Sequence, residues 1–333
     1  MNYESGYTAS FYAAFIDPIS WHDRDRFELI DGSVSRTDDG LRQSADLECT
    51  DYDETQERWI RIYMDANQSG NVTHEALFTG IATSPSHDID GQYVERSVEC
   101  YSVLKPCEDI LLPRGWHVRA GTNGIEAIME LLKATPAPIE AEEGAPLLSN
   151  TIIAEDDETN LSMIDAILSA INWRLQIRGD GTIVLSPLPD TESATFSADG
   201  LDILQTSLSV DRDWFNCPNV FRASSDDMIS IARDDDPSSA LSTVARGREI
   251  WMGDDDVDLS DDETIAEYAV RRLKEEQQVA ETAKYTRRYI PEVNVGDLVK
   301  LNYDQIKGTY TVTSQTIQLT YAATTDEEVE CLK

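Results

Sequence analysis

The sequence predicts an α+β protein that is mainly β, with two small β-barrel domains and an inserted α/β region. Three observations support this: apolar and polar residues alternate with period two over long stretches, Gly-containing turns recur every ~10 to 15 residues, and helical periodicity is confined to a few segments. We expect a first barrel at residues 1–105, an α+β insert at 106–195 and a second barrel at 196–333.

The first region shows the clearest strand alternation. Asp46 and Glu48 alternate with apolar residues, and an Asp39-Gly40 turn leads into them. Because successive side chains of a strand point to opposite faces, one parity is expected in the core and the other in solvent. The expected core positions here are Ala45, Leu47, Cys49, Ile60, Ile62 and Met64.

The middle region changes to helical periodicity. Asn123 and Glu126 have the spacing of a capping box at the start of one helix. Apolar residues in 161–171 recur at helical spacing and predict a second helix. Alternating residues in 173–185 follow at once, interrupted by Gly179-Asp180-Gly181, which predicts a tight hairpin.

The last region returns to strand patterns around one long helix at about residues 260–280. Ser260 and Glu263 have capping-box spacing, and acidic residues between them suit the helix dipole. A break at Pro291 precedes further strands. The expected buried stripe of this helix is Ala266, Ala269, Val270, Leu273 and Ala280.

The charge balance is extreme, with 27 basic and 63 acidic residues and a net charge of −36. Such a surface repels phosphates and anionic membranes, so we expect no stable nucleic-acid binding and no membrane insertion. No apolar run reaches the ~20 residues of a membrane span, and no signal peptide is visible at the start. The acidity fits either a salty environment or a wall past which nucleic acid slides.

No motif marks a reactive centre. Five cysteines without a CxxC spacing fit a reduced protein, and Cys49 and Cys100 are expected in the core. Carboxylates are abundant, but none is distinguished as a glycosidase pair. We therefore expect no enzyme, no catalytic residue and no cofactor. The four histidines, none at metal-ligand spacing and all expected in loops or on the surface, are His22, His74, His87 and His117.

One loop imitates the start of a calcium site. Asp65, Asn67 and Ser69 place oxygen atoms at alternate positions before Gly70. The twelfth position is Ala76, which cannot supply the bidentate carboxylate of such a loop. A plain hairpin is the preferred interpretation, and a weak calcium site is the alternative.

Four segments, in order, carry a family resemblance. They are Leu77-Phe78-Thr79-Gly80-Ile81, the helix and hairpin around 173–185, residues 236–242 before Gly247-Arg248, and the capped helix followed by Pro291 and Gly296-Asp297-Leu298-Val299. With them the chain resembles the baseplate or tail-tip hub proteins of tailed bacteriophages, a group related to late-control D proteins and to the N-terminal part of VgrG spike proteins.

The resemblance implies a structural protein of the virion, at the tail baseplate or tip, assembled in the host cytoplasm. Three subunits would close a ring that joins the hexameric tail tube to a central spike or fibre and lets DNA pass. The implied partners are sister subunits, a distal tail or tail tube protein, and a spike, fibre or tape-measure protein. The alternatives are a spike-carrying protein of a contractile injection system, a tail-tip hydrolase or glycosidase, and a calcium-dependent adhesin.

Overall fold

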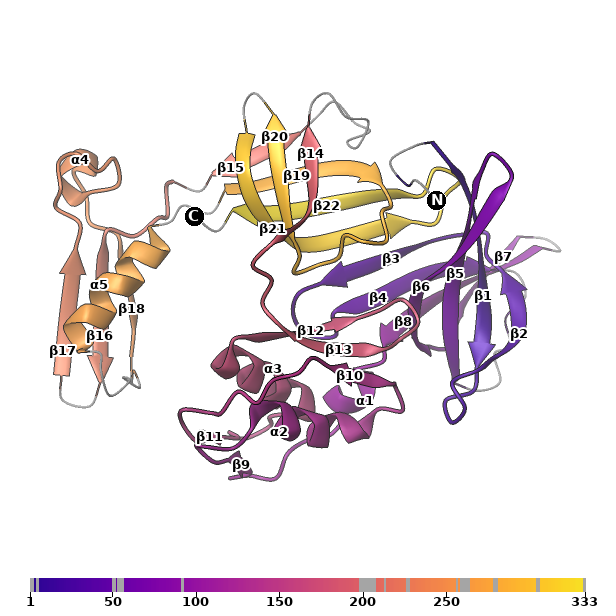
Figure 1. Ribbon diagram of the computed structural model, residues 1–333, viewed down its shortest axis with the longest axis horizontal. Helices are drawn as coiled ribbons and strands as arrows, with labels where there is room; N and C mark the ends of the chain where they lie inside the picture. Colours follow the sequence, from indigo (N-terminus) through magenta and orange to yellow (C-terminus); the bar gives the residue numbers. More distant parts are fainter. Residues whose placement is uncertain are drawn as a thin grey trace. The chain divides into compact units, whose positions relative to one another are not determined.

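The computed structural model describes residues 3, 6–49, 52, 57–90, 93–197, 208–212, 214–225, 228–255, 257, 264–277, 281–303 and 306–331. Its contacts divide the chain into two compact units, one of residues 1–208 with 284–329 and one of residues 209–283 with 330–333. Strands dominate the regular structure, which confirms the mainly β class (Figure 1). None of the sheets closes on itself within the described residues, so the two barrels stay a prediction.

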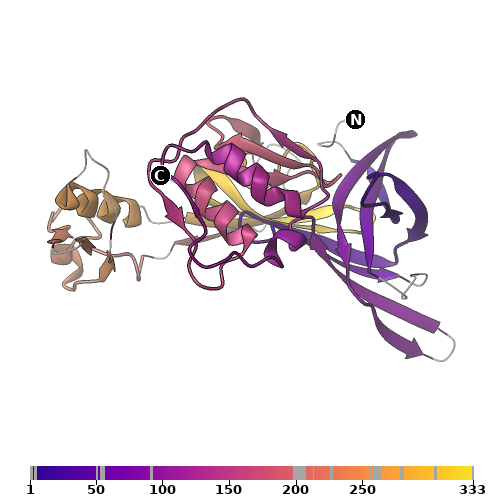
Figure 2. The same cartoon turned by 90° about the horizontal axis from the view of Figure 1, so that it is seen from below.

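Residues 8–102 of unit 1 contain its first eight strands. β5 pairs with β1 and β6 in long antiparallel ladders, and β4 lies between β3 and β8. The pair β7–β8 projects as a hairpin beyond its neighbours (Figure 2). The strands are β1 (Thr8–Ile16), β2 (Asp23–Glu28), β3 (Asp31–Thr37), β4 (Gln43–Cys49), β5 (Arg58–Gln68), β6 (Asn71–Ala82), β7 (Ser86–Asp90) and β8 (Tyr93–Ser102).

The C-terminal strands continue the same sheet. Its order includes β19-β22-β21-β3-β4-β8-β6-β5-β1-β2, and β20 pairs with both β14 and β21. The long strand β21 therefore joins β20 with its first half and β3 with its second half. These strands are β14 (Glu192–Ser197), β19 (Glu281–Arg288), β20 (Leu298–Tyr303), β21 (Ile306–Gln318) and β22 (Thr324–Cys331).

The helices of unit 1 gather beside one small sheet, in the order β10-β13-β12. The helix at 160–171 and the hairpin after it are confirmed. The capping box predicted for Asn123 and Glu126 is wrong, because Asn123 Oδ1 instead accepts from the Ile125 amide at 3.0 Å. The elements are α1 (Lys105–Glu108), β9 (His117–Val118), α2 (Gly124–Leu131), η1 (Leu132–Ala134), β10 (Ile139–Ala141), β11 (Ile152–Ile153), α3 (Asn160–Ile171), β12 (Trp173–Ile177) and β13 (Ile183–Pro187).

Unit 2 is a small sheet with one covering helix. Its sheet has the order β17-β16-β18, and α5 packs on β16 and β17. No helix among the described residues of either unit is long and apolar enough to cross a membrane. The elements are β15 (Ser209–Arg212), β16 (Val220–Ser225), β17 (Met228–Arg233), α4 (Thr243–Arg246), β18 (Trp251–Asp254) and α5 (Ile265–Glu276).

The long helix of the last region is confirmed over Ile265–Glu276 and begins at a capping box of Thr264 with Glu267. The predicted capping box of Ser260 and Glu263 lies outside the described residues. Ala269 and Leu273 are buried as expected. Ala266 is exposed and Val270 is 47% exposed, so their assignment to the stripe is wrong, and Ala280 lies outside the described residues. A three-stranded sheet offers this helix only a narrow contact, so its apolar stripe is narrower than the sequence suggests.

The domain boundaries at residues 105 and 195 remain a prediction, because residues 1–208 all belong to the same compact unit. Separate apolar cores do exist within unit 1. One joins the N-terminal strands to Tyr289 and Ile317, and the other lies among the helices and includes Ile128 and Ile164. The expected second barrel, residues 196–333, is divided between the two units.

The tip of the β12–β13 hairpin is fixed on the N-terminal strands. The Gly179 carbonyl accepts from Thr79 Oγ1 at 2.7 Å, and the Asp180 carbonyl accepts from Trp21 Nε1 and from Arg61 Nη2, both at 3.0 Å. A Cβ atom at Gly179 would lie 1.7 Å from the Ala76 carbonyl oxygen. Only glycine allows this backbone approach, which explains the predicted Gly-Asp-Gly turn.

A buried ion pair stands between β19 and β22. The side chains of Arg287 and Glu327 are both 0% exposed and form a salt bridge. Tyr285 Oη and Gln315 Nε2 also donate to the Glu327 carboxylate, at 2.5 and 2.8 Å, and burial raises the pKa of Tyr285 well above its usual value. Because removing one charge would leave the other buried and unpaired, this network holds the two strands in one arrangement.

The motif Phe78-Thr79-Gly80 has a steric reason. Phe78 is fully buried in β6, and a Cβ atom at Gly80 would lie 2.7 Å from its ring and 2.1 Å from the Tyr101 carbonyl oxygen of β8. The glycine therefore lets the ring and the neighbouring strand approach the same point.

Replacing Gly80 with alanine is expected to lower the free energy of unfolding by about 3 kcal/mol, because the added methyl group must displace the ring or the strand. Urea unfolding measures this. The matched control is Gly6→Ala, where no atom lies within 4 Å of the new Cβ and a change within about 0.5 kcal/mol is expected. Equal effects of the two substitutions would contradict the steric explanation.

Candidate functional site

The outer face of β21, β3, β4 and β8 carries acids and hydroxyl groups in rows. In one row Gln318 lies opposite Ser33, Ser33 opposite Asp46, and Asp46 opposite Glu99. The alternate positions, such as Leu47, are buried. Period-two alternation thus places one parity in the core and the other on this face, as the sequence predicts. We call this surface the acidic face; its second row is Asp31, Glu48, Ser97 and Ser86.

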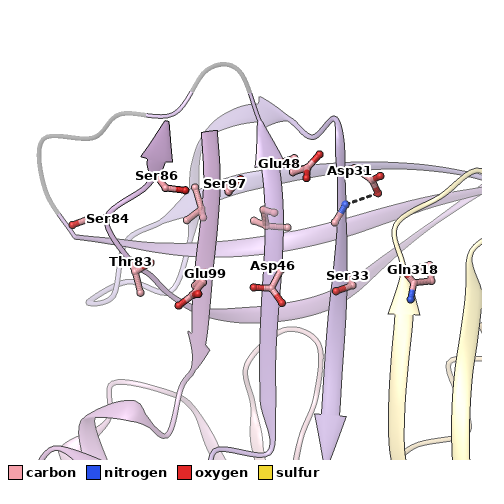
Figure 3. Close-up of a pocket in the computed structure, with 13 residues that line it drawn as sticks. Asp31, Ser33, Asp46, Glu48, Thr83, Ser84, Ser86, Ser97, Glu99 and Gln318 are labelled. Atoms are coloured by element: carbon pink, nitrogen blue, oxygen red, sulfur yellow. Dashed lines mark hydrogen bonds between the residues drawn. The ribbon is translucent and has the colours of Figure 1, made fainter. Parts of the chain in front are cut away.

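A pocket of about 580 Å³ lies over the acidic face (Figure 3). In the figure Asp46 and Glu99 stand beside Ser33 and Gln318. The Asp31 carboxylate accepts from the Gly32 amide at 2.7 Å, which fixes the start of β3. The described residues of the lining include no Lys, Arg, His or Cys; they are Asp31, Gly32, Ser33, Asp46, Leu47, Glu48, Thr83, Ser84, Ser86, Ser97, Val98, Glu99 and Gln318.

The electrostatics of this face are those of a repelling surface. Asp46 and Glu99 lie directly opposite each other on neighbouring strands, where like charges destabilise a sheet unless solvent or ions screen them. Within the described part of the chain, no three acids, histidines or cysteines converge as the ligands of one metal ion. The carboxylates therefore act as a spread of negative charge, which disfavours bound phosphates and attracts mobile cations.

His22, His74 and His117 are exposed, as expected, and do not line this pocket. The side chain of His87 lies outside the described residues. Cys49 and Cys100 are buried core residues, which confirms that prediction, and burial raises the pKa of the Cys100 thiol well above its usual value.

The calcium candidates lie on a regular hairpin. Asp65 and Asn67 belong to β5, and Ser69-Gly70 form the turn to β6, both with positive φ. The Asp65 carboxylate contacts His74 Nδ1 at 2.7 Å, and Asn67 Oδ1 accepts from the Gly70 amide at 3.0 Å. Two of the three candidate ligands are thus already engaged in the hairpin, and calcium binding by Asp65, Asn67 and Ser69 remains a prediction.

Two runs of aspartates in unit 2, residues 234–236 and 254–256, are also engaged internally. Hydrogen bonds from Ser238 lower the pKa of Asp236, and those from Ser224 and Arg222 lower the pKa of Asp255. Asp254 accepts from Tyr268 and Arg272. The neighbouring Asp256 lies outside the described residues. These carboxylates therefore stabilise unit 2 through hydrogen bonds within it.

Sequence reasoning recognised the alternation of Asp46 and Glu48 but not the acidic face as a whole. The face forms because β21 pairs with β3, which places Gln318 next to Ser33 across most of the chain. The sequence does show, for each strand, which alternate residues are polar. Which strands are neighbours is set by tertiary packing and cannot be read from one strand.

No protein-family model and no curated protein sequence matches the chain. Among solved structures it is similar to the 43 kDa tail protein of prophage MuSo2 from Shewanella oneidensis, with 14% identity, 98% of each chain covered and a TM-score of 0.69. It is similar to the tail protein from Neisseria meningitidis MC58, with 16% identity, 98% of this chain and 97% of that chain covered, and a TM-score of 0.68.

A chain of the Francisella PdpA–VgrG complex is also similar, with 9% identity and a TM-score of 0.57, over 98% of this chain and 58% of that chain. The chain therefore has the fold of these tail and VgrG-complex proteins along nearly its whole length. The resemblance drawn from the sequence is confirmed at the level of the fold.

If the Asp65 loop is a plain hairpin, calorimetric titration of the chain with calcium will give no saturable heat at micromolar concentrations, because Asp65 and Asn67 already have partners. Saturable binding that is lost in Asp65→Ala would instead establish the calcium site. Asp31→Ala is the matched control, since it removes one carboxylate from the start of another strand of unit 1.

Proposed function

We propose that this chain is a non-catalytic structural hub subunit of a phage tail baseplate or tail tip. Three copies form a ring that joins the hexameric tail tube to a central spike or fibre. The observation that carries the proposal is the full-length likeness to two tail proteins, with 98% of this chain covered in each case. The location that follows is the virion tail, after assembly in the host cytoplasm.

The ring accounts for the open sheets. A sheet that is not closed leaves strand edges with unpaired backbone groups, and closure with neighbouring strands removes such edges. In the proposed ring, each subunit contributes two barrel-like segments, so that three subunits match a sixfold tube. An interface of obligate size, ~2,000 Å² or more, offsets the repulsion between subunits that each carry −36 charges.

The acidic face is the surface that we assign to the channel. Its Asp and Glu side chains lie along one face of the sheet, and the described residues that line its pocket include no Lys or Arg. Proteins bind DNA with Lys and Arg side chains, which displace counterions from the phosphates. An acidic wall displaces none, so DNA passes along it without being bound. This assignment selects the channel interpretation of the acidity over that of a salty environment.

The proposed partners follow from the same position in the tail. They are two sister copies, a distal tail or tail tube protein on one side, and a spike, fibre or tape-measure protein on the other. The likeness to a chain of a PdpA–VgrG complex favours a second candidate, a spike-carrying protein of a contractile injection system. A tail-tip hydrolase or glycosidase is the third, and assays on peptidoglycan and polysaccharide separate it from the hub.

Light scattering should show a mass near three times that of the 37.2 kDa chain at high salt and a smaller mass at low salt, because salt screens the repulsion between subunits. Electron microscopy of the larger species should show threefold rings. A chain that stays monomeric at every salt concentration, or a particle in which it occupies no threefold or sixfold position, would contradict the hub.

Particles that carry Asp46→Lys with Glu99→Lys should release DNA more slowly than unmodified particles, because lysines on the acidic face bind passing phosphates. Fluorescence of a DNA dye follows the release. The control pair is Glu126→Lys with Glu143→Lys, two exposed acids with the same change in charge. Equal slowing by both pairs would exclude the acidic face as the channel wall.

A further inference from the structure

The strand β17 forms an open edge of the small sheet in unit 2. That sheet has the order β17-β16-β18, and within the described residues β17 pairs with β16 alone. Figure 1 shows β17 at the outer side of unit 2, away from β18. The strand reads MISIAR, and its register with β16 has no bulge. It therefore lacks the proline, the lysine and the bulge with which proteins commonly protect an exposed edge.

The register of β17 shows which of its backbone groups face the open edge. The Asp234 amide donates to the Asn219 carbonyl at 3.0 Å, so these two residues are a hydrogen-bonded pair at the end of the ladder with β16. Bonded and non-bonded pairs alternate along an antiparallel ladder. The alternation turns the N–H and C=O groups of Ile229, Ile231 and Arg233 away from β16. These groups are placed to pair with a further strand.

The helix α5 has exposed apolar residues on the flank beside this edge. Gln277 Nε2 donates to Asp234, directly after β17, at 3.0 Å. At 3.6 residues per turn, Ala266 and Val270 lie on the same flank of the helix as Gln277. Both are exposed, although the sequence pattern places them in the apolar stripe. Three strands are too few to cover that stripe, and a fourth strand beyond β17 would widen the sheet on the side where it is exposed.

The surface beside the open edge carries no net negative charge, in contrast to the chain with its net charge of −36. β17 contains one base and no acid. The hollow that Ala266 and Val270 line on α5 also holds two acids and two bases, which are Glu267, Glu275, Arg271 and Lys274. A second copy of the chain can therefore approach here without the repulsion that opposes contact at surfaces such as the acidic face.

The sequence of β17 suits antiparallel pairing with itself. With Ser230 on a twofold axis, Ile229 of one copy lies opposite Ile231 of the second copy. Both isoleucines direct their backbone groups to the edge, so the two residues of such a pair can exchange both hydrogen bonds. Cross-strand pairs of β-branched residues stabilise a sheet. An axis at Ile231 would instead place Ile229 opposite Arg233, an apolar side chain opposite a charged one.

We propose that two copies of this chain associate through their β17 strands, which pair antiparallel with Ser230 at the twofold axis. The joined sheet has the order β18-β16-β17-β17-β16-β18, and the apolar flanks of both α5 helices lie on one face of it. The contact is short, so the association is weak and reversible. The inference goes beyond the proposed hub and does not rest on it, because this contact has a twofold axis and involves unit 2 alone.

Disulfide trapping of the full chain tests the register. Every variant also carries Cys331→Ser, since the other four cysteines are buried. Ser230→Cys is expected to form a covalent dimer with oxidised glutathione, because the two Cα atoms at the axis would lie ~4.5 Å apart, within the range of disulfides.

The matched control is Ile229→Cys, which lies on the same strand and is 65% exposed. In the proposed register it lies diagonal to its own copy, at ~7 to 8 Å, and should cross-link about tenfold more slowly than Ser230→Cys. Random collisions would instead favour the more exposed position.

A substitution on the helix flank tests whether α5 takes part. In the Ser230→Cys chain, Val270→Asp is expected to slow cross-linking about tenfold, because it places two like charges on the flanks that meet. The matched control is Val72→Asp in unit 1, which adds the same charge at a valine of similar exposure, 49% against 47%. It should leave the rate within about twofold. Thermal unfolding of each variant checks that it folds.

Three outcomes would overturn the proposal: no covalent dimer from Ser230→Cys, equal cross-linking of Ser230→Cys and Ile229→Cys, or equal slowing by Val270→Asp and Val72→Asp. The first would leave the edge to a strand of another polypeptide. The second would reduce the contact to random collision, and the third would exclude the helix flank.

Discussion

The register of the strands in unit 1 is the constraint on which the rest of that unit depends. Side chains alternate between two faces, so Ala45 and Leu47 enter the core only if Asp46 and Glu48 point outward. A slip by one residue would bury those carboxylates without partners, at a cost of several kcal/mol each. The same alternation that fills the core therefore builds the acidic face, and neither can change without the other.

Local patterns in the sequence were sufficient for most elements. The buried parity of Ile60 and Met64, the helix at 160–171 and the Gly-containing hairpin after it each depend on neighbouring residues only. Two features could not be found that way. The pairing of β21 with β3 and the exposure of Val270 both result from which distant segments pack together. Asn123 shows the same limit on a smaller scale. Its position before the helix fits both a capping box with Glu126 and the single bond from the Ile125 amide that the structure contains.

Charge is distributed in a way that the net value of −36 conceals. Acids occupy the solvent parity of the strands, where water and ions screen them. Several arginines instead take buried positions: Arg287 pairs with Glu327 in the core, and Arg36 donates to the Leu77 carbonyl. A guanidinium can hydrogen-bond in several directions at once, which suits it to sites where water is excluded. The buried arginines of this protein thus connect interior segments by hydrogen bonds, while the acidic residues of the acidic face repel anions.

The ladder between β3 and β21 also sets an order of events during synthesis. Ser35 and Thr316 are neighbours although 281 positions separate them. At ~5 to 20 residues per second, a ribosome needs tens of seconds to deliver the second strand after the first. During that interval β3 has an open edge, and the charges beside it hinder pairing with the wrong chain. Most of unit 2 is one continuous stretch, residues 209–283. It can therefore fold before the N-terminal strands of unit 1 have their C-terminal partners. In the nascent chain, unit 2 therefore folds before β3 and β21 pair.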